Sequence, residues 1–329
     1  VLKIAADDSY TFAPVDRLGK VYTNNTWNRR HIEQVLALPL VDREAIAKAG
    51  FKVAVDAVNS VGGVIVPELL RALGVKEVIE LNCTPTGYFG HTPEPIPENL
   101  GYIAALVGES GADVGFVVDP DVDRLAIISD GGAFFGEEYT LVSIADYVLA
   151  HTPGNTVSNL SSSRALADVT RAHGGSYQAA AVGEVNVTTK MKETGAVIGG
   201  EGNGGVIYPA IHYGRDALVG IALFLTMMAK TAKKPTEIRA ALPAYHIYKT
   251  KIQLTPELDV DAILDAIKKH FAGEKITDID GVKIDFAESW VHLRKSNTEP
   301  IIRIYSEAHT PEEAAALADK IKAIVDTIV

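Results

Sequence analysis

Residues Gly115 to Ile128 read GFVVDPDVDRLAII, and this stretch predicts both the fold and the chemistry of the chain. Two short apolar runs rich in β-branched residues flank a connection of six residues. Such runs are typical of strands buried on both faces of a sheet, and the connection is too short for a helix. Its proline fixes one backbone angle and disfavours strand pairing there. The stretch therefore predicts a strand, a loop and a strand, with three carboxylates and an arginine in the loop.

Three interpretations of this loop compete. Aspartate and proline are common in solvated turns, but three aspartates at alternate positions exceed what a turn requires. An EF-hand loop has glycine at its sixth position and helices on both sides, whereas this chain has Arg124 there, between two predicted strands. A hard cation accounts for Asp119, Asp121 and Asp123 together, because Mg²⁺ takes carboxylate oxygens as ligands. We therefore favour a metal site for phosphoryl transfer, with Mg²⁺ as the ion, and a solvated turn stays open as the alternative.

Length and composition exclude several classes of protein. A chain of 329 residues is too long for one ordinary core, so two to four domains are expected. A net charge of −11 without a basic run argues against a nucleic-acid partner. The longest apolar stretches, such as Leu218 to Met228, are too short to span a membrane. A single cysteine, Cys83, excludes an internal disulfide and indicates a reducing, cytoplasmic location.

The order of the predicted elements indicates the fold class. Strands and helices alternate from Lys52 to about Leu242, as in α/β domains with mixed, mainly parallel sheets. Two successive units share this order, which is what a distant internal duplication would produce. From about Tyr245 several strand-like runs surround one helix, and a final helix covers Thr310 to Ile328, which indicates an α+β domain. The predicted divisions are a remnant and connector (1–40), two similar α/β domains (41–137 and 138–243) and the α+β domain (244–329).

Two further stretches carry candidate binding residues. Gly199 to Gly205 places Glu201 and Asn203 among five glycines, a composition that suits recognition of sugar hydroxyls, although a flexible hairpin tip is the alternative. Between two predicted strands, a turn rich in hydroxyls, amides and guanidinium groups has the composition of a phosphate cradle, although an ordinary turn is the alternative. Its candidate residues are Arg294, Ser296, Asn297, Thr298 and Arg303. Among the histidines, His212 is the one beside a candidate loop.

Together the three loops resemble those of the α-D-phosphohexomutase superfamily, which comprises phosphoglucomutases, phosphomannomutases and phosphoglucosamine mutases. The run DPDVDR resembles its metal loop, usually DGDGDR. GEGNG resembles its sugar-specificity loop, usually GExSG, and RKSNT resembles its phosphate loop, usually RxSNT. The resemblance extends from about Ile32 to the end of the chain. Asn203 stands where the family usually has serine, and Gly205 where many members have histidine, so the preferred sugar stays open.

The resemblance implies a hexose-phosphate mutase that interconverts sugar 1- and 6-phosphates through a bisphosphorylated sugar and a phosphoserine. A phosphoglucomutase or phosphomannomutase is favoured, and a phosphoglucosamine mutase is the alternative. Its partners would be phosphates of glucose, mannose or glucosamine, without nucleic acid or membrane, and the protein would be a monomer or homodimer. Mg²⁺ would bind Asp119, Asp121 and Asp123, and Arg124 would be catalytic. Sugar hydroxyls would bind to Glu201 and Asn203, and the non-reacting phosphate to Arg294, Ser296, Asn297, Thr298 and Arg303.

The serine loop of the family, Thr-Ala-Ser-His-Asn-Pro, does not occur in this sequence. The chain opens on Val1 without Met, and its first 40 residues resemble the tail of the domain that carries the serine. We therefore expect this chain alone to keep its fold and to have negligible mutase activity. Two other functions stay open: a metal-dependent phosphatase of haloacid-dehalogenase type with Asp119 as nucleophile, and a non-catalytic sugar-phosphate-binding module.

Overall fold

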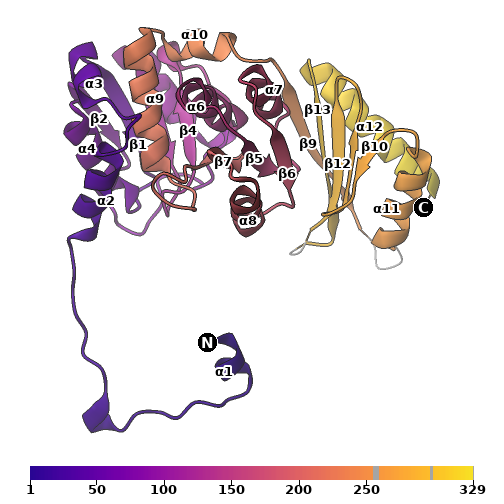
Figure 1. Ribbon diagram of the computed structural model, residues 1–329, viewed down its shortest axis with the longest axis horizontal. Helices are drawn as coiled ribbons and strands as arrows, with labels where there is room; N and C mark the ends of the chain where they lie inside the picture. The colour runs from indigo at the N-terminus through magenta and orange to yellow at the C-terminus, as the bar shows by residue number, and fades with distance from the viewer. Residues whose placement is uncertain (255–258, 297–298, 329) are drawn as a thin grey trace.

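The computed structural model describes residues 1–254, 259–296 and 299–328. Three sheets follow one another along the chain, and helices flank each of them (Figure 1). This mixed α/β architecture, with an antiparallel sheet in the C-terminal part, confirms the predicted fold class. Asn297 and Thr298, two of the predicted phosphate ligands, lie outside the described residues.

The first sheet has the strand order β2-β1-β3-β4. Its first three strands run parallel, and β4 returns antiparallel to β3. Every residue of β3 and β4 is buried, as their apolar sequences predict. The elements are α3 (Arg43–Ala49), β1 (Lys52–Asp56), α4 (Gly62–Leu73), β2 (Glu77–Leu81), α5 (Gly101–Ser110), β3 (Val114–Val118) and β4 (Leu125–Ile128).

The second sheet repeats this plan with the order β6-β5-β7-β8. Three strands are again parallel, and the fourth again forms a hairpin with the third. Because β3–β4 and β7–β8 are equivalent hairpins, the aspartate loop and the glycine-rich loop occupy equivalent positions in the two sheets. The elements are α6 (Glu137–His151), β5 (Thr156–Asn159), α7 (Ala165–Ala172), β6 (Tyr177–Ala180), α8 (Glu184–Thr194), β7 (Ile198–Glu201), β8 (Gly205–Ile207) and α9 (Ala217–Thr231).

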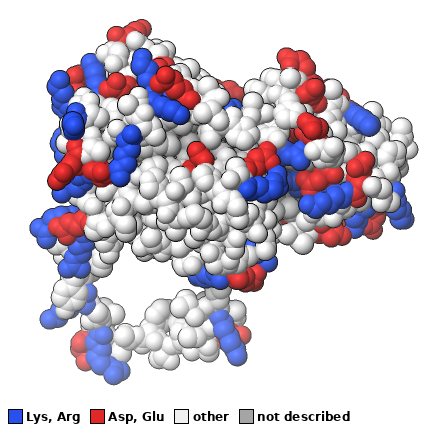
Figure 2. Space-filling model, turned by 45° about the horizontal axis from the view of Figure 1, so that its top comes forward, with Lys and Arg blue, Asp and Glu red and all other residues white. Residues whose placement is uncertain are grey.

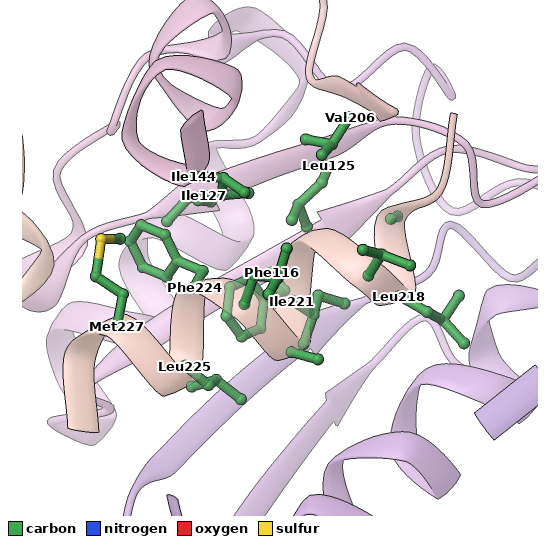
Figure 3. Close-up of a cluster of buried hydrophobic side chains, with 14 of the residues drawn as sticks. Phe116, Leu125, Ile127, Ile144, Val206, Leu218, Ile221, Phe224, Leu225 and Met227 are labelled. Atoms are coloured by element: carbon green, nitrogen blue, oxygen red, sulfur yellow. The ribbon is translucent and has the colours of Figure 1, made fainter. Parts of the chain in front are cut away.

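Helix α9 joins the cores of these two sheets (Figure 3). All its residues from Ala217 to Met228 are buried, as expected for a helix that is apolar on every face. The ring of Phe224 meets Phe116 of β3 and Phe135 edge-on, at centroid distances of 6.2 and 5.3 Å. A single hydrophobic cluster therefore runs through both sheets and fixes their hairpins relative to each other.

The third sheet is antiparallel, has the order β10-β11-β12-β13-β9 and packs its own core against two helices. The sequence predicted several strands and both helices in this part of the chain, and β10, with three residues, is too short to show a strand pattern. The elements are α10 (Pro235–Ala240), β9 (His246–Gln253), α11 (Val260–His270), β10 (Lys275–Thr277), β11 (Val282–Asp285), β12 (Trp290–Lys295), β13 (Ile301–Ala308) and α12 (Pro311–Ile328).

The segment before α2 (Trp27–Leu36) extends away from the body of the molecule (Figure 1). It contains two short helical pieces, Leu2–Ala6 and Val15–Arg17, and none of their residues is buried. Helix α2 itself buries Ile32 and Val35.

The divisions at residues 40, 137 and 243 stay a prediction. No helix among the described residues is long and apolar enough to cross a membrane.

Hydrogen bonds attach the third sheet to the second. His292 of β12 donates from Nε2 to the Asp280 carbonyl at 2.6 Å, so its Nδ1 accepts from the hydroxyl of Ser161 at 2.9 Å. Lys283 of β11 donates to the carbonyl of Leu160 at 2.8 Å. His292 is buried at this contact and is neutral in the arrangement that these bonds require.

The buried histidine predicts a pH dependence of stability. Burial lowers the pKa of His292 to about 4, below the value of about 6.5 for an unfolded histidine. The unfolded chain then binds more protons between these values, so stability is lost as pH falls from about 6.5 toward 4. Between pH 7 and pH 5 we expect the wild type to lose about 2 kcal/mol more unfolding free energy than His292→Gln, measured by urea denaturation. Equal losses in both proteins would contradict this prediction. The control is His270→Gln, because His270 is exposed.

Three hairpins at one candidate active site

The aspartate loop has a strained backbone. Val122, a β-branched residue, adopts a left-handed conformation with φ of 65°, which is costly and is typical of functional sites. Asp119 Oδ1 accepts hydrogen bonds from the backbone N–H groups of Asp123 and Arg124, at 3.1 and 3.0 Å. The Val122 carbonyl accepts from the N–H of Ala217 at 3.1 Å, which ties the loop to the start of α9. The loop is therefore held firmly in its unfavourable shape.

The three predicted metal ligands lie together. Asp119, Asp121 and Asp123 each offer a carboxylate oxygen, and these oxygens lie within 4.8 Å of one another. Asp123 Oδ1 is buried without a hydrogen-bond partner among the described residues. Burial and the charges of its two neighbours raise the pKa of Asp119 to about 6. An orphaned oxygen and crowded negative charges, all on hard oxygen ligands, fit a cation such as Mg²⁺.

Arg124 stands beside these carboxylates with a free donor. Its Nε lies 3.6 Å from Asp119 Oδ2 and 3.9 Å from Asp123 Oδ1, which is too far for a hydrogen bond. This Nε is buried and has no hydrogen-bond partner among the described residues. Arg124 can therefore donate to an anionic group placed between it and the aspartates.

The glycine-rich loop is packed, in contrast to a flexible hairpin tip. A Cβ atom on Gly202 would lie 1.9 Å from Oε2 of Glu138, and one on Gly204 would lie 2.4 Å from the Leu125 carbonyl oxygen. Gly204 also has a φ of 88°, in the left-handed region. These glycines allow a close approach to α6 and to β4. The loop therefore lies directly against the strand that follows the aspartates.

The two equivalent hairpins touch each other. The N–H of Leu125 donates to the Gly204 carbonyl at 3.0 Å, and Arg124 forms an antiparallel bridge with Gly205. Backbone pairing across this contact gives the aspartate loop and the glycine-rich loop a fixed register. The residues predicted to hold a metal and those predicted to bind a sugar are therefore parts of one rigid unit.

Arg215, which the sequence did not single out, joins the same two loops by its side chain. Its guanidinium pairs with Asp123, with Glu201 at 2.8 Å and with Glu184 at 3.0 Å. The Arg215 side chain is 14% exposed and lies against Gly205, where an added Cβ would come within 2.4 Å of its Cδ. His212, which the sequence favoured, instead pairs with Asp216 at 2.9 Å.

Glu201 is ordered by several partners. Its Oε1 accepts from the Asn159 side chain at 2.9 Å and from the Gly183 N–H at 3.2 Å, while Oε2 accepts from Arg215. The residue is 4% exposed. A carboxylate has about four acceptor positions, so these three bonds leave room for about one more donor. Asn203 is less buried, and its side-chain oxygen accepts from the Gly205 N–H at 3.2 Å.

The third hairpin, between β12 and β13, brings two arginines together. Arg294 and Arg303 are directly opposite each other in the antiparallel register, and Lys251 of β9 is the next partner in the same row. Like charges directly opposite are destabilising. Asp280 lies 3.5 Å from Arg294, and Glu299 lies 3.0 Å from Arg303. The Nε of Arg303 is buried without a hydrogen-bond partner among the described residues, so the pair can receive an anion.

One cavity of about 260 Å³ lies where the three hairpins meet. It brings together five predicted site residues, Arg124, Glu201, Asn203, Arg294 and Arg303. Ser296, which was also predicted to bind phosphate, is not among the residues that line this cavity. It is buried, and its hydroxyl accepts from the Glu299 N–H at 3.3 Å. The lining that the sequence did not predict includes Glu94, Glu137, Glu138, Asn159, Ser161, Lys249 and Tyr305.

The cavity mixes both signs of charge. Four carboxylates, from Glu94, Glu137, Glu138 and Glu201, face four cationic groups, from Arg124, Lys249, Arg294 and Arg303. Acidic and basic side chains are also interspersed over the molecular face shown in Figure 2. A lining of this kind suits a ligand that has both hydroxyls to donate and an anionic group to accept hydrogen bonds.

Comparison with known proteins places this geometry in a family. Domains II, III and IV of phosphoglucomutase/phosphomannomutase match residues 29–132, 136–245 and 250–324. A Thermococcus kodakarensis phosphoglucomutase/phosphomannomutase is 39% identical over 83% of this chain and 60% of its own length. A probable phosphoglucosamine mutase of Methanopyrus kandleri is 32% identical over 94% of this chain and 68% of its own length.

Solved structures agree with the sequence comparisons. A phosphoglucomutase/phosphomannomutase family protein of Burkholderia thailandensis superposes with a TM-score of 0.84 at 27% identity, covering 99% of this chain and 69% of that one. A putative phosphomannomutase of Thermus thermophilus gives a TM-score of 0.78 at 26% identity, covering 94% of this chain and 68% of that one. The chain therefore belongs to the phosphoglucomutase/phosphomannomutase family, and it spans 60% of the length of its Thermococcus relative.

Proposed function

We propose that this chain forms the metal-, sugar- and phosphate-binding part of a hexose-phosphate mutase. The enzyme would interconvert sugar 1- and 6-phosphates through a bisphosphorylated sugar. The observation that carries the proposal is the cavity shared by the β3–β4, β7–β8 and β12–β13 hairpins. Arg124, which directly follows the aspartates of the metal loop, lines this cavity, whereas the three aspartates are not among its lining residues. Names of relatives include both phosphoglucomutase/phosphomannomutase and phosphoglucosamine mutase, so glucose, mannose and glucosamine phosphates are the candidate substrates.

The two arginines of the third sheet would bind the phosphate group that does not react. Arg294 and Arg303 offer planar donor groups that match phosphate oxygens, and an anion between them would relieve their mutual repulsion. Lys249, beside Tyr305 in the same lining, adds a third positive charge. Holding the remote phosphate would use binding energy to position the reacting hydroxyl.

Glu201 and Asn203 would orient the sugar. Each can interact with hydroxyl groups, Glu201 through its remaining acceptor capacity and Asn203 through its amide. Because Glu201 is already fixed by Asn159, Gly183 and Arg215, it would not need to be ordered when the sugar binds. This fixed acceptor would bind hydroxyls at sugar positions that the 1-phosphate and the 6-phosphate present to it in both binding orientations.

Asp119, Asp121 and Asp123 would hold Mg²⁺, which supplies neutralisation of the charge that develops on the transferred phosphoryl group. Arg124, with its free Nε donor, would bind an oxygen of the same group. The phosphoryl donor expected from the resemblance is the family's serine loop, which the printed sequence does not contain. This chain would therefore supply the groups that bind the substrate and the charges that stabilise the transferred phosphoryl group.

Replacing a phosphate-binding arginine should weaken ligand binding. We expect Arg294→Ala to raise the Kd for glucose 1-phosphate about 10- to 100-fold, because a charge-assisted hydrogen bond is lost. Isothermal titration calorimetry measures this directly, with mannose and glucosamine 1-phosphates as further ligands. Lys275→Ala is the matched control, because it removes an exposed positive charge from the edge strand of the same sheet. Equal affinities of the Arg294 and Lys275 variants would refute the assigned phosphate site.

A metal-loop substitution should act on cation binding alone. Asp121 is exposed, so Asp121→Asn should preserve folding and lower the affinity for Mg²⁺ by at least about tenfold, because one charged ligand is lost. The increase of melting temperature with added Mg²⁺ reports this binding. Asp319→Asn, an exposed substitution on α12, is the control. The metal assignment is wrong if Mg²⁺ stabilises the Asp121 variant as strongly as the control.

A further inference from the structure

A second group of metal-ligating side chains lies outside the cavity. It consists of His31 on α2, His212 in the segment after β8, and Asp216 at the start of α9. The two Nε2 atoms lie 2.8 and 2.9 Å from the same oxygen, Oδ2 of Asp216. Segments almost two hundred residues apart in sequence therefore bring three potential ligand atoms together.

The carboxylate of this group is fixed in direction. Asp216 Oδ1 caps α9 by accepting from the N–H groups of Leu218 and Val219, at 2.9 and 3.2 Å. This leaves Oδ2 pointing at the two imidazoles. Burial alone would raise the pKa of Asp216, but the bonds from His212 and His31 outweigh it and lower the pKa to about 2. The carboxylate is thus ionised throughout the physiological range.

We infer that His31, His212 and Asp216 form a binding site for a divalent transition-metal cation of the Zn²⁺ class. Two imidazoles and one carboxylate are the ligands of such ions in proteins. Both Nε2–Oδ2 distances are shorter than the separation of about 4.2 Å that two opposite ligands have when bound to one ion at about 2.1 Å. All three ligand atoms lie within 4.8 Å of one another. The imidazoles are 27% and 41% exposed, so an ion can enter and water can complete its coordination.

The site differs from the aspartate loop in the ion that it prefers. Asp119, Asp121 and Asp123 offer oxygen ligands alone, which suit Mg²⁺, whereas the imidazole nitrogens favour a softer ion. The N-terminus of α9 carries about half a positive charge, which opposes a cation there. The full negative charge of Asp216 outweighs it, so the site keeps a net attraction for a divalent ion.

A bound ion would anchor the first packed helix of the fold. His31 is on α2, which follows the exposed N-terminal segment, while Asp216 directly follows Arg215. An ion bridging the two would tie α2 to Asp216, whose preceding residue, Arg215, pairs with Asp123 and Glu201. The ion would therefore be structural, and its binding should raise the melting temperature of the chain.

The test is a titration of the whole chain with Zn²⁺ and Co²⁺ in the presence of excess Mg²⁺. Calorimetry gives the stoichiometry, and the visible d–d absorption of Co²⁺ reports nitrogen ligands. We expect one site, and a loss of affinity of at least about tenfold in both His31→Gln and His212→Gln. Asp121→Asn should retain the site. The matched control is His173→Gln, since His173 pairs with a single carboxylate, that of Asp146 at 2.7 Å.

Three results would overturn the inference: no stoichiometric Zn²⁺ or Co²⁺ binding, binding that survives both histidine substitutions, or binding lost in Asp121→Asn. The first result would show that the two histidines only share hydrogen bonds with Asp216. The variants are on different segments and at partly exposed positions, so one of them keeps the test decisive if the other fails to fold. None of these outcomes depends on whether the chain binds a sugar phosphate.

Discussion

The three-way ion pair of Arg215 is the contact on which the site geometry depends. One guanidinium, 14% exposed, satisfies Asp123 of the aspartate loop, Glu201 of the glycine-rich loop and Glu184 at the start of α8. Without it these three carboxylates would repel one another, because water screens like charges only weakly at partly buried positions. Arg215 thus makes it possible to place a metal loop and a sugar-binding carboxylate side by side.

The repeated topology of the first two sheets explains why the loops meet there. Each sheet has the same strand order, and each carries its functional loop in the hairpin between its third and fourth strands. The backbone bridge from Arg124 to Gly205 brings the two hairpins edge to edge. Helix α9 fills the core below them, so the arrangement is fixed by packing as well as by charge. The first two sheets supply most of the acidic lining of the cavity.

The third sheet supplies most of the opposite charge. Arg294, Arg303 and Lys251 form one row across three strands, a like-charge arrangement that an anionic ligand would stabilise. The buried contact between His292 and Ser161 sets this sheet against the second one. The cavity therefore has an acidic side suited to hydroxyl groups and a basic side suited to phosphate. One ligand could contact both sides through different parts of its structure.

The sequence was most informative where chemistry is local. The buried strands β3 and β4 follow from the apolar runs on either side of the aspartate loop. The three loops were recognisable because each concentrates its residues within a few positions. In contrast, Arg215 and Lys249 act through partners 14 to 112 residues away, so no local pattern marks them. Strands of three residues, such as β8 and β10, carry too few positions to show a period.

The segment after β8 shows why the sequence drew attention to the wrong residue. His212 attracted attention because it follows the glycine-rich loop, yet its ring pairs with Asp216 while Arg215, three residues later, enters the site. The order of residues in an irregular segment does not determine which side chain pairs with the residues of the two loops. Only the packing of that segment against β8, through the bridge of Ile207 with Arg215, decides it.

A crystal structure of this chain with Mg²⁺ and glucose 1-phosphate tests the central claim most directly. We predict an ion on Asp119, Asp121 and Asp123, with the phosphate between Arg294 and Arg303 and the sugar hydroxyls against Glu201 and Asn203. A second cavity, of about 930 Å³, lies between α3, α5 and the end of α9. A sugar phosphate bound in that cavity, or one bound away from both arginines, would contradict the claim that the three hairpins form a single substrate site.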